Sequence, residues 1–246
     1  MPNCTSTKTN EKTKPLSVII PEAIEDKIAV IRMDDGKANA FDFEIFAEIN
    51  YALDQAETHQ AGLVVFAGRD GLFCGGLDLK LLPTLAPARI LDLVTQFGKT
   101  IGRIFLFPAP TVAAIAGHAI AGGLQLAFAC DRRYAQEGPY RIQMNEMVTG
   151  MILPSWMIHI STKAIPVEWR GEALLHARAY SPAEAMGKKL LNGIVPVGKD
   201  LVSAVKESCR DLMKIDRSAY AYTKKLMHGP GLQEAFAKLP MELARK

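Results

Sequence analysis

Two short apolar runs that each lead into a pair of adjacent glycines constrain the fold more than any other feature of this chain. "LVVFAG" (63–68) is followed by "FCGGLDL" (73–79), and "TVAAIAG" (111–117) is followed by "AIAGGLQL" (119–126). Apolar runs of this length are typical of buried strands. We expect a helix to begin directly after each glycine pair. Strands that alternate with helices predict an α/β fold with a largely parallel sheet.

The remaining pattern predicts one α/β core followed by a helical C-terminal region. Before the first glycine turn we expect a strand over 28–33, paired with an earlier β-rich run, and an amphipathic helix over 41–56. A second helix is expected near 88–107. From about Ser155 the pattern is nearly all helical, with a last helix from about Gly231. The predicted divisions are a disordered tail over 1–16, a core over 17–195 and C-terminal helices over 196–246.

Composition excludes several classes of protein. The 246 residues are 49% hydrophobic and 22% charged, which is typical of a folded globular chain. A net charge of +3 without a basic, aromatic-rich stripe argues against nucleic-acid binding, and no apolar run is long enough to span a membrane. The four scattered cysteines form no CxxC pair, which favours reduced thiols, a cytoplasmic location and no metal site. Cys74, in a glycine-rich loop, is a candidate nucleophile.

The glycine turns admit two interpretations. The first N–H groups of a helix lack internal partners and lie at the positive end of its dipole. Two such ends that converge could bind an anionic oxygen, as an oxyanion hole does. Alternatively, the glycines only make tight turns. They match neither GxGxxG nor GKS/GKT. In the helix expected after the second glycine pair, the first polar side chain is Gln125, whose amide neither takes up nor releases a proton at neutral pH.

The segment "YRIQMNEMVTGMILPSW" (140–156) contains the most informative carboxylate. Glu146 lies between two apolar, methionine-rich runs, with Gly150 and Pro154 shortly after it. A carboxylate in such surroundings is either a buried structural ion or a base whose pKa is raised by desolvation. The residues alone leave both possibilities open.

In combination, these segments resemble the crotonase, or enoyl-CoA hydratase/isomerase, superfamily. The resemblance runs from about Ser17 and includes "KANAFD" (37–42), "GLFCGGLDL" (71–79), "PTVAAIAGHAIAGGLQLAFACDRRYA" (110–135) and "SPAEAMGKKLLNGIV" (181–195). The Glu146 segment is most similar to mitochondrial-type enoyl-CoA isomerases, which have one catalytic glutamate in an NE-x-x-x-G context with Pro-x-Trp nearby. The resemblance implies an α/β fold with a crotonase-like ββα spiral core.

The resemblance also implies roles for individual residues. The backbone N–H groups of Leu77 and Gly122 would form the oxyanion hole for a thioester carbonyl, and Glu146 would be the base. Gln125 occupies the position where hydratases have a second glutamate. Asp78 and Asp131 match positions that are generally structural. Coenzyme A would be part of the substrate, with no separate cofactor and no metal. The residues expected to bind coenzyme A are Lys37, Ala38, Gly75, Gly76, Leu79 and Lys80.

The implied activity is movement of an enoyl-CoA double bond from the β,γ to the α,β position, which needs a single base. The alternatives are an enoyl-CoA hydratase of fatty-acid β-oxidation and a non-catalytic acyl-CoA binder. Gln125 would either orient the substrate or be a satisfied polar residue of the pocket wall. A homotrimer or a dimer of trimers is also implied. Leu201, Val205 and Leu212 form an apolar stripe that would serve such packing, or would pack within its own chain.

Overall fold

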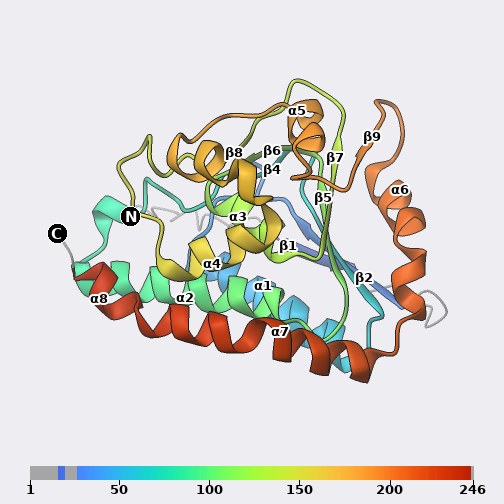
Figure 1. Ribbon diagram of the computed structural model, residues 1–246, viewed down its shortest axis with the longest axis horizontal. Coiled ribbons are helices and arrows are strands. Elements are labelled where there is room, and N and C mark those ends of the chain that lie inside the picture. Colours follow the sequence, from blue (N-terminus) through green and yellow to red (C-terminus); the bar gives the residue numbers. More distant parts are fainter. Residues whose placement is uncertain (1–15, 20–26, 245–246) are drawn as a thin grey trace, which may run out of the picture.

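The computed structural model describes residues 16–19 and 27–244 and has two β-sheets with helices packed around them (Figure 1). The larger sheet has the strand order β1-β2-β3-β5-β7-β9, in which β1 is antiparallel to β2 and all other pairs are parallel. The α/β class with a largely parallel sheet is therefore confirmed. The strands of this sheet are β1 (Leu16–Ile19), β2 (Ile28–Met33), β3 (Leu63–Ala67), β5 (Thr111–Ile115), β7 (Arg132–Gln136) and β9 (Gly193–Val195).

Three successive ββα units build the centre of the described chain. In each unit the first strand joins the larger sheet and the second joins a parallel three-stranded sheet with the order β4-β6-β8. A helix follows each pair. This is the ββα spiral that the resemblance predicts, although the sequence shows no repeat. The units are β3, β4 (Gly71–Cys74) and α2 (Pro87–Phe105); β5, β6 (Gly117–Ile120) and α3 (Gly122–Ala129); β7, β8 (Ile142–Gln143) and α4 (Ser155–Ala164).

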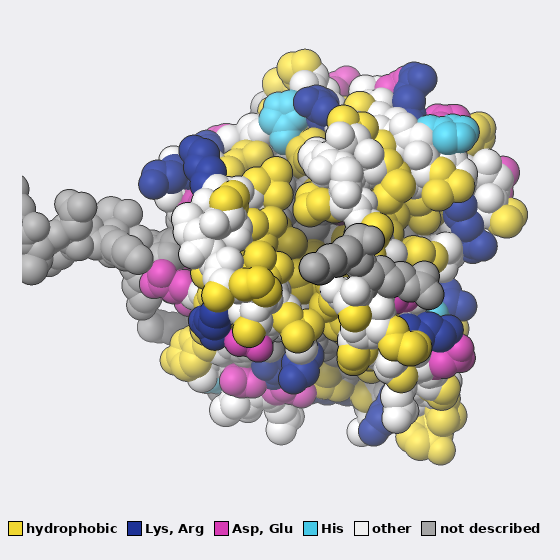
Figure 2. All heavy atoms as spheres, turned by 90° about the vertical axis from the view of Figure 1, so that its left-hand side faces the viewer, with side chains coloured by type: hydrophobic (Ala, Val, Ile, Leu, Met, Phe, Trp, Pro, Cys, Tyr) yellow, Lys and Arg dark blue, Asp and Glu magenta, His cyan; other side chains and the backbone are white. Residues whose placement is uncertain are grey.

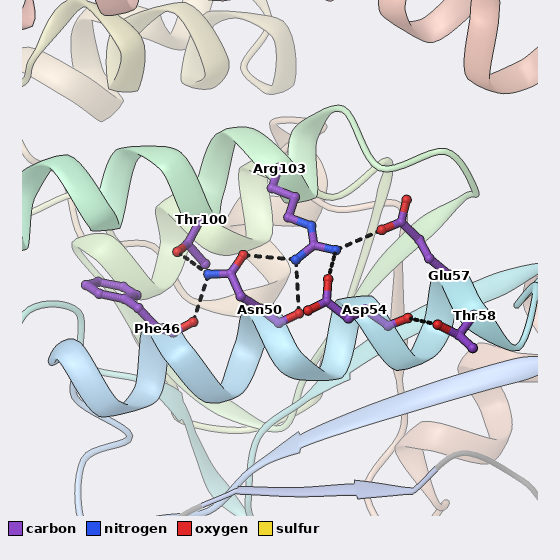
Figure 3. Close-up of polar contacts among 7 residues, drawn as sticks. All are labelled: Phe46, Asn50, Asp54, Glu57, Thr58, Thr100 and Arg103. Carbon is purple, nitrogen blue, oxygen red and sulfur yellow. Dashed lines mark hydrogen bonds and ion pairs between the residues drawn. The ribbon is translucent and has the colours of Figure 1, made fainter.

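Polar contacts fix α2 against α1 (Phe43–Thr58), which is the helix that the spacing of apolar residues predicted over 41–56 (Figure 3). The Asn50 amide of α1 donates to the Thr100 hydroxyl of α2 at 2.8 Å. Arg103 of α2 donates to the carboxylates of Asp54 and Glu57 at 2.6 and 2.8 Å. These bonds set the position of α2 along α1. That position matters because residues of α2 line the pocket described below.

Of the two alternatives for the apolar stripe of Leu201, Val205 and Leu212, the structure has the second, in which the stripe packs within its own chain. Helix α6 (Leu201–Ser208) covers one face of the larger sheet, where Leu201 and Val205 are 7% and 0% exposed. Leu212 packs against the same cluster. The physical reason is that this face of β2, β3 and β5 is apolar and needs a cover. The homotrimer or dimer of trimers itself stays a prediction.

Two helix starts differ from expectation. No helix begins directly after Gly75–Gly76, because Leu77 forms a parallel bridge with Phe41 and the chain then turns through a 3₁₀ segment (Leu82–Thr84) before α2. Cys74, which the sequence placed in a glycine-rich loop, is the last residue of strand β4. The last long helix, α7 (Arg217–Ala237), begins well before Gly231 and contains Pro230 in its interior; α8 (Leu239–Leu243) follows.

The other helical segments of the C-terminal region are short. They are 3₁₀ helices over Val167–Trp169 and Arg210–Lys214, a π-helix over Gly171–Leu175, and α5 (Pro182–Gly187). The predicted tail falls almost entirely on residues 1–15, which lie outside the described residues, so it stays a prediction. No helix in the described part of the chain is long and apolar enough to cross a membrane.

Candidate active site

The carboxyl ends of the three strands of the smaller sheet open into one pocket. Leu77 follows β4, Gly122 follows β6, and Glu146 follows β8, each within three residues of the end of its strand. All three line a cavity of about 230 Å³. Parallel strands bring their carboxyl ends to one edge of a sheet, which is where α/β proteins generally bind ligands. The fold therefore assembles the three residues that the sequence analysis singled out for chemistry.

The pocket wall is mostly apolar. Six of the lining residues come from α2, α4 and α8, and the others come from the segments that follow β4, β6 and β8. Many hydrophobic side chains are exposed on the side of the molecule where α8 lies (Figure 2). The lining residues are Gly75, Leu77, Leu79, Leu82, Ile90, Val94, Phe97, Ala121, Gly122, Asn145, Glu146, Met151, Ile152, Pro154, Trp156, Met157 and Leu243.

The two N–H groups predicted to form an oxyanion hole are close together and free. Gly76 O accepts from Phe41 N at 2.7 Å and Asp78 N donates to Phe41 O at 3.0 Å, so the intervening Leu77 N–H points away from Phe41. Gly122 is the first residue of α3, so its N–H has no partner within the helix. In the described part of the chain, neither N–H donates a hydrogen bond.

The backbone around these donors is held in unusual conformations. Gly76 has φ +86°, and a Cβ there would lie 2.8 Å from the Gly122 nitrogen, so only glycine leaves that nitrogen accessible. Ala121, directly before α3, has φ +50° and its N–H donates to Gln143 O at 2.8 Å. A non-glycine residue at positive φ costs of order 1–3 kcal/mol, and such strain clusters at functional sites.

Glu146 has the environment of a general base. Its side chain is only 5% exposed, and its Oε2 atom is buried with no hydrogen-bond partner. Burial raises its pKa from 4.5 to about 7, because the charged form loses its hydration. Of the two possibilities that the sequence left open, a structural ion would have a bonded partner, and Oε2 of this carboxylate has none among the described residues. A base with a pKa near neutrality is well matched to proton transfer.

Gln125 lies outside the pocket lining. It is fully buried in α3, its Oε1 accepts from the Ser161 hydroxyl at 2.7 Å, and its Nε2 donates to Met157 O at 3.4 Å. Both ends of the amide are therefore used to join α3 to α4. This arrangement favours the satisfied polar residue over the substrate-orienting one.

The residues expected to bind coenzyme A fall into two groups. Gly75 and Leu79 line the pocket, whereas Lys37, Ala38, Gly76 and Lys80 do not. Gly75 N–H donates to Ala38 O at 2.9 Å, which joins the "KANAFD" segment to the glycine turn. Lys37 and Lys80 are exposed near the turn. Their contact with coenzyme A stays a prediction.

The remaining candidates have structural surroundings. Burial raises the pKa of the Cys74 thiol to about 12, and the thiol donates to Asn39 O at 3.0 Å, so it is unsuited to nucleophilic attack. Asp131 accepts from Thr111 N and from Lys224 Nζ at 2.7 and 2.9 Å. Among the described residues, no group of three or more His, Cys, Asp or Glu side chains is arranged to hold a metal ion.

Sequence reasoning missed several pocket residues. Asn145, beside Glu146, has a buried Oδ1 without a partner. Phe97 and Trp156 meet edge to face at 5.1 Å in the apolar wall. Leu243 comes from the last helix. Apolar pocket residues carry the same sequence signal as core residues, so only the adjacent Asn-Glu pair offered a clue.

Comparison with known proteins agrees with this geometry. The sequence model of the family described as enoyl-CoA hydratase/isomerase matches residues 23–242. The chain belongs to the enoyl-CoA hydratase/isomerase family. This confirms the resemblance to the crotonase superfamily, and the solved structures of this family agree with the fold. An enoyl-CoA hydratase/isomerase family protein from Pseudomonas syringae superposes with a TM-score of 0.86 at 28% identity, covering 94% of this chain and 97% of that one.

Named relatives in the family divide between two activities. The mitochondrial enoyl-CoA delta isomerase 1 of Rattus norvegicus is 28% identical over 73% of this chain, and a probable enoyl-CoA hydratase of Bacillus subtilis is 31% identical over 76%. The matches cover 63% and 71% of those proteins. The chain thus spans less than two thirds of the rat relative. One Mycobacterium tuberculosis protein has been solved twice and is named an enoyl-CoA isomerase in one structure and a probable enoyl-CoA hydratase in the other. The first structure has a TM-score of 0.84 at 28% identity, covering 94% of this chain and 99% of that one.

Proposed function

We propose that this protein is an enoyl-CoA isomerase that moves a double bond from the β,γ to the α,β position of an acyl-CoA thioester. One observation carries the proposal: in the described part of the chain, Glu146 is the one pocket-lining side chain that can ionise. Isomerisation needs a single base that removes a proton and returns it, whereas hydration also needs groups that position a water. The mitochondrial relatives named enoyl-CoA delta isomerase 1 support the same choice.

The mechanism begins with the thioester carbonyl oxygen accepting hydrogen bonds from the N–H groups of Leu77 and Gly122. Glu146 then removes a proton from C2, and the negative charge of the resulting dienolate collects on that oxygen. The carboxylic acid of Glu146 returns the proton to C4, which leaves the double bond between C2 and C3. One oxyanion donor contributes about 10²–10³-fold to turnover, and a positioned base about 10²–10⁴-fold.

A hydratase is the second candidate, and a specific observation favours it. Asn145 Oδ1 and Glu146 Oε2 are both buried without partners at the same pocket. A water that donated to both oxygens would be held for addition to an α,β double bond. In this version Asn145, not Gln125, replaces the second glutamate of hydratases, because Gln125 is bonded to α4. The Bacillus subtilis relative bears a hydratase name.

A paired assay separates the two. The purified protein is given a β,γ-enoyl-CoA and, separately, an α,β-enoyl-CoA, and isomerisation and hydration are followed spectroscopically. We expect isomerisation to be the faster reaction. Glu146→Gln should abolish it and leave acyl-CoA affinity nearly unchanged, since the amide keeps the shape of the side chain. Asn145→Ala serves as the matched variant and should retain isomerisation within about tenfold, as expected for loss of one hydrogen bond of about 1 kcal/mol.

The opposite pattern assigns the protein differently. Hydration that clearly outpaces isomerisation and is lost in Asn145→Ala would establish the hydratase. Tight binding of acyl-CoA with neither reaction would identify a non-catalytic acyl-CoA binder.

A further inference from the structure

The C-terminal helix α8 contributes to the pocket from a distant part of the chain. Leu243, in its last turn, lines the cavity together with Pro154, Trp156 and Met157, which come from the start of α4. Figure 1 shows α8 at one end of the molecule, directly after α7. Leu243 is half-buried and packs against the main hydrophobic core.

A polar contact seats α8 on α4. Helix α4 begins after Pro154, which has no side-chain acceptor, so its first N–H groups lack a local cap. Glu242 of α8 supplies one from 87 residues away: its carboxylate accepts from Ser155 N at 3.0 Å and from the Ser155 hydroxyl. A carboxylate at a helix N-terminus is stabilised by the helix dipole and by its charge-assisted hydrogen bonds. The Glu242–Ser155 contact therefore fixes α8 at the residues that begin the pocket wall.

The end of α7 supports the same part of the wall. The ring of Phe236 stacks on Trp156 with centroids 5.9 Å apart and planes at 17°. Gly98 of α2 leaves room for this stack, since a Cβ there would lie 2.8 Å from Phe236 and 3.2 Å from Trp156. Leu239, the first residue of α8, is 5% exposed. The wall formed by Trp156 and Leu243 is thus positioned from outside by the two last helices.

We propose that Leu243, held in place by the Glu242–Ser155 contact, closes the apolar part of the pocket and sets the length of the acyl chain that the protein accepts. This inference rests on the proposed acyl-CoA substrate. Apart from Asn145 and Glu146, the side chains that line the pocket with Leu243 are apolar, as an alkyl tail requires, and the cavity of about 230 Å³ is small for a ligand site. Any side chain that bounds so small a space decides which tails fit.

The experiment measures how affinity and turnover depend on chain length. Saturated acyl-CoA thioesters of increasing length are titrated by calorimetry, and kcat/KM is measured for the matching β,γ-enoyl-CoA series. Leu243→Ala should shift both profiles toward longer chains, with at least about a tenfold change in the ratio of a long to a short substrate, because one methylene in an apolar pocket changes kcat/KM by about 10–200-fold. Leu243→Trp should shift them toward shorter chains.

Two further variants separate positioning from general stability. Met241→Ala removes an exposed side chain, 67% accessible, from the same helix and should leave both profiles unchanged. Glu242→Gln weakens the contact with Ser155 and should move the profiles in the same direction as Leu243→Ala, which a loss of stability alone would not do. Thermal unfolding of each variant shows whether it is folded.

The outcomes are distinguishable. Equal changes at every chain length in folded Leu243→Ala, or no change, would overturn the inference and leave the proposed function intact. Absence of acyl-CoA binding by the unaltered protein would remove the proposed function, and this inference with it.

Discussion

Replacing the buried base with its neutral amide should stabilise the protein, and the gain should depend on pH. Folding raises the pKa of Glu146 from 4.5 to about 7. A raised pKa in the folded state means that the carboxyl group's contribution to stability is complete below about pH 4.5 and is lost as the pH rises through about 7. At 1.36 kcal/mol per pKa unit, the total loss is about 3 kcal/mol. Glutamine does not titrate, so Glu146→Gln avoids this loss.

The assay is urea denaturation of the unaltered protein and of Glu146→Gln at about pH 5 and about pH 8. The difference between their free energies of unfolding should grow by about 2.5 kcal/mol over this interval, in favour of the variant. Comparing the same two proteins at two pH values cancels any fixed effect of the amide on packing. The isomerase rate of the unaltered protein should rise through the same interval, because the base must be ionised to accept a proton.

A control variant keeps the interpretation specific. Glu168→Gln removes an exposed carboxylate, and the difference in unfolding free energy between this variant and the unaltered protein should be the same at both pH values. If the Glu146→Gln difference is also constant with pH, Glu146 is not desolvated in the folded protein, and its assignment as the base loses its physical ground.

Three other substitutions test the site and its supports. Gly76→Ala should lower turnover about 10²–10³-fold, since the new Cβ would crowd the Gly122 nitrogen. Gly71→Ala, also at positive φ but with open space around the new Cβ, should lower only the stability of the fold. Steady-state kinetics and circular dichroism compare the two variants, and equal turnover in both would argue against the oxyanion hole. Gln125→Glu should lower the free energy of unfolding by about 1–3 kcal/mol, because a carboxylate oxygen would replace the donor to a main-chain carbonyl, and hydratase activity should not appear. Lys224→Met should destabilise the fold by about 1–3 kcal/mol, because the Asp131 carboxylate loses its cationic partner while it keeps its bonds from Thr111, and activity should be retained; denaturant titration and the isomerase assay check both.

Much of the fold follows from local pattern, and the failures have identifiable causes. The strand before Gly117 and the helix after Asp42 were predictable because their apolar periods are clear and their ends carry turn or cap residues. The start of α7 was not, because Pro230 normally ends a helix and here lies inside one. The turn after Gly76 is extended because a distant segment pairs with it. Long-range pairing of that kind leaves no local signal.

The chemical groups of the site were easier to predict than its walls. The glycine pairs were predictable because glycine allows another group to approach the backbone closely. Glu146 was predictable because burial of a carboxylate in an apolar run is costly and therefore indicates a functional or structural role. Gln125 was noticed for the same reason, yet its two bonds to α4 depend on packing that the sequence does not encode locally. Leu243 could not be distinguished from an ordinary core leucine.

The division of the site among three ββα units makes its chemistry separable. Each strand of the smaller sheet delivers one group: β4 and β6 precede the two N–H donors, and β8 precedes the base. The donors belong to the main chain and are indifferent to side-chain replacement at most positions, while the base resides in a segment of its own. A protein engineer could therefore exchange the segment after β8, and with it the acid or base, without rebuilding the anion-binding half. One scaffold can in this way acquire new reactions, all of which place negative charge on the same oxygen, by replacing a single connection.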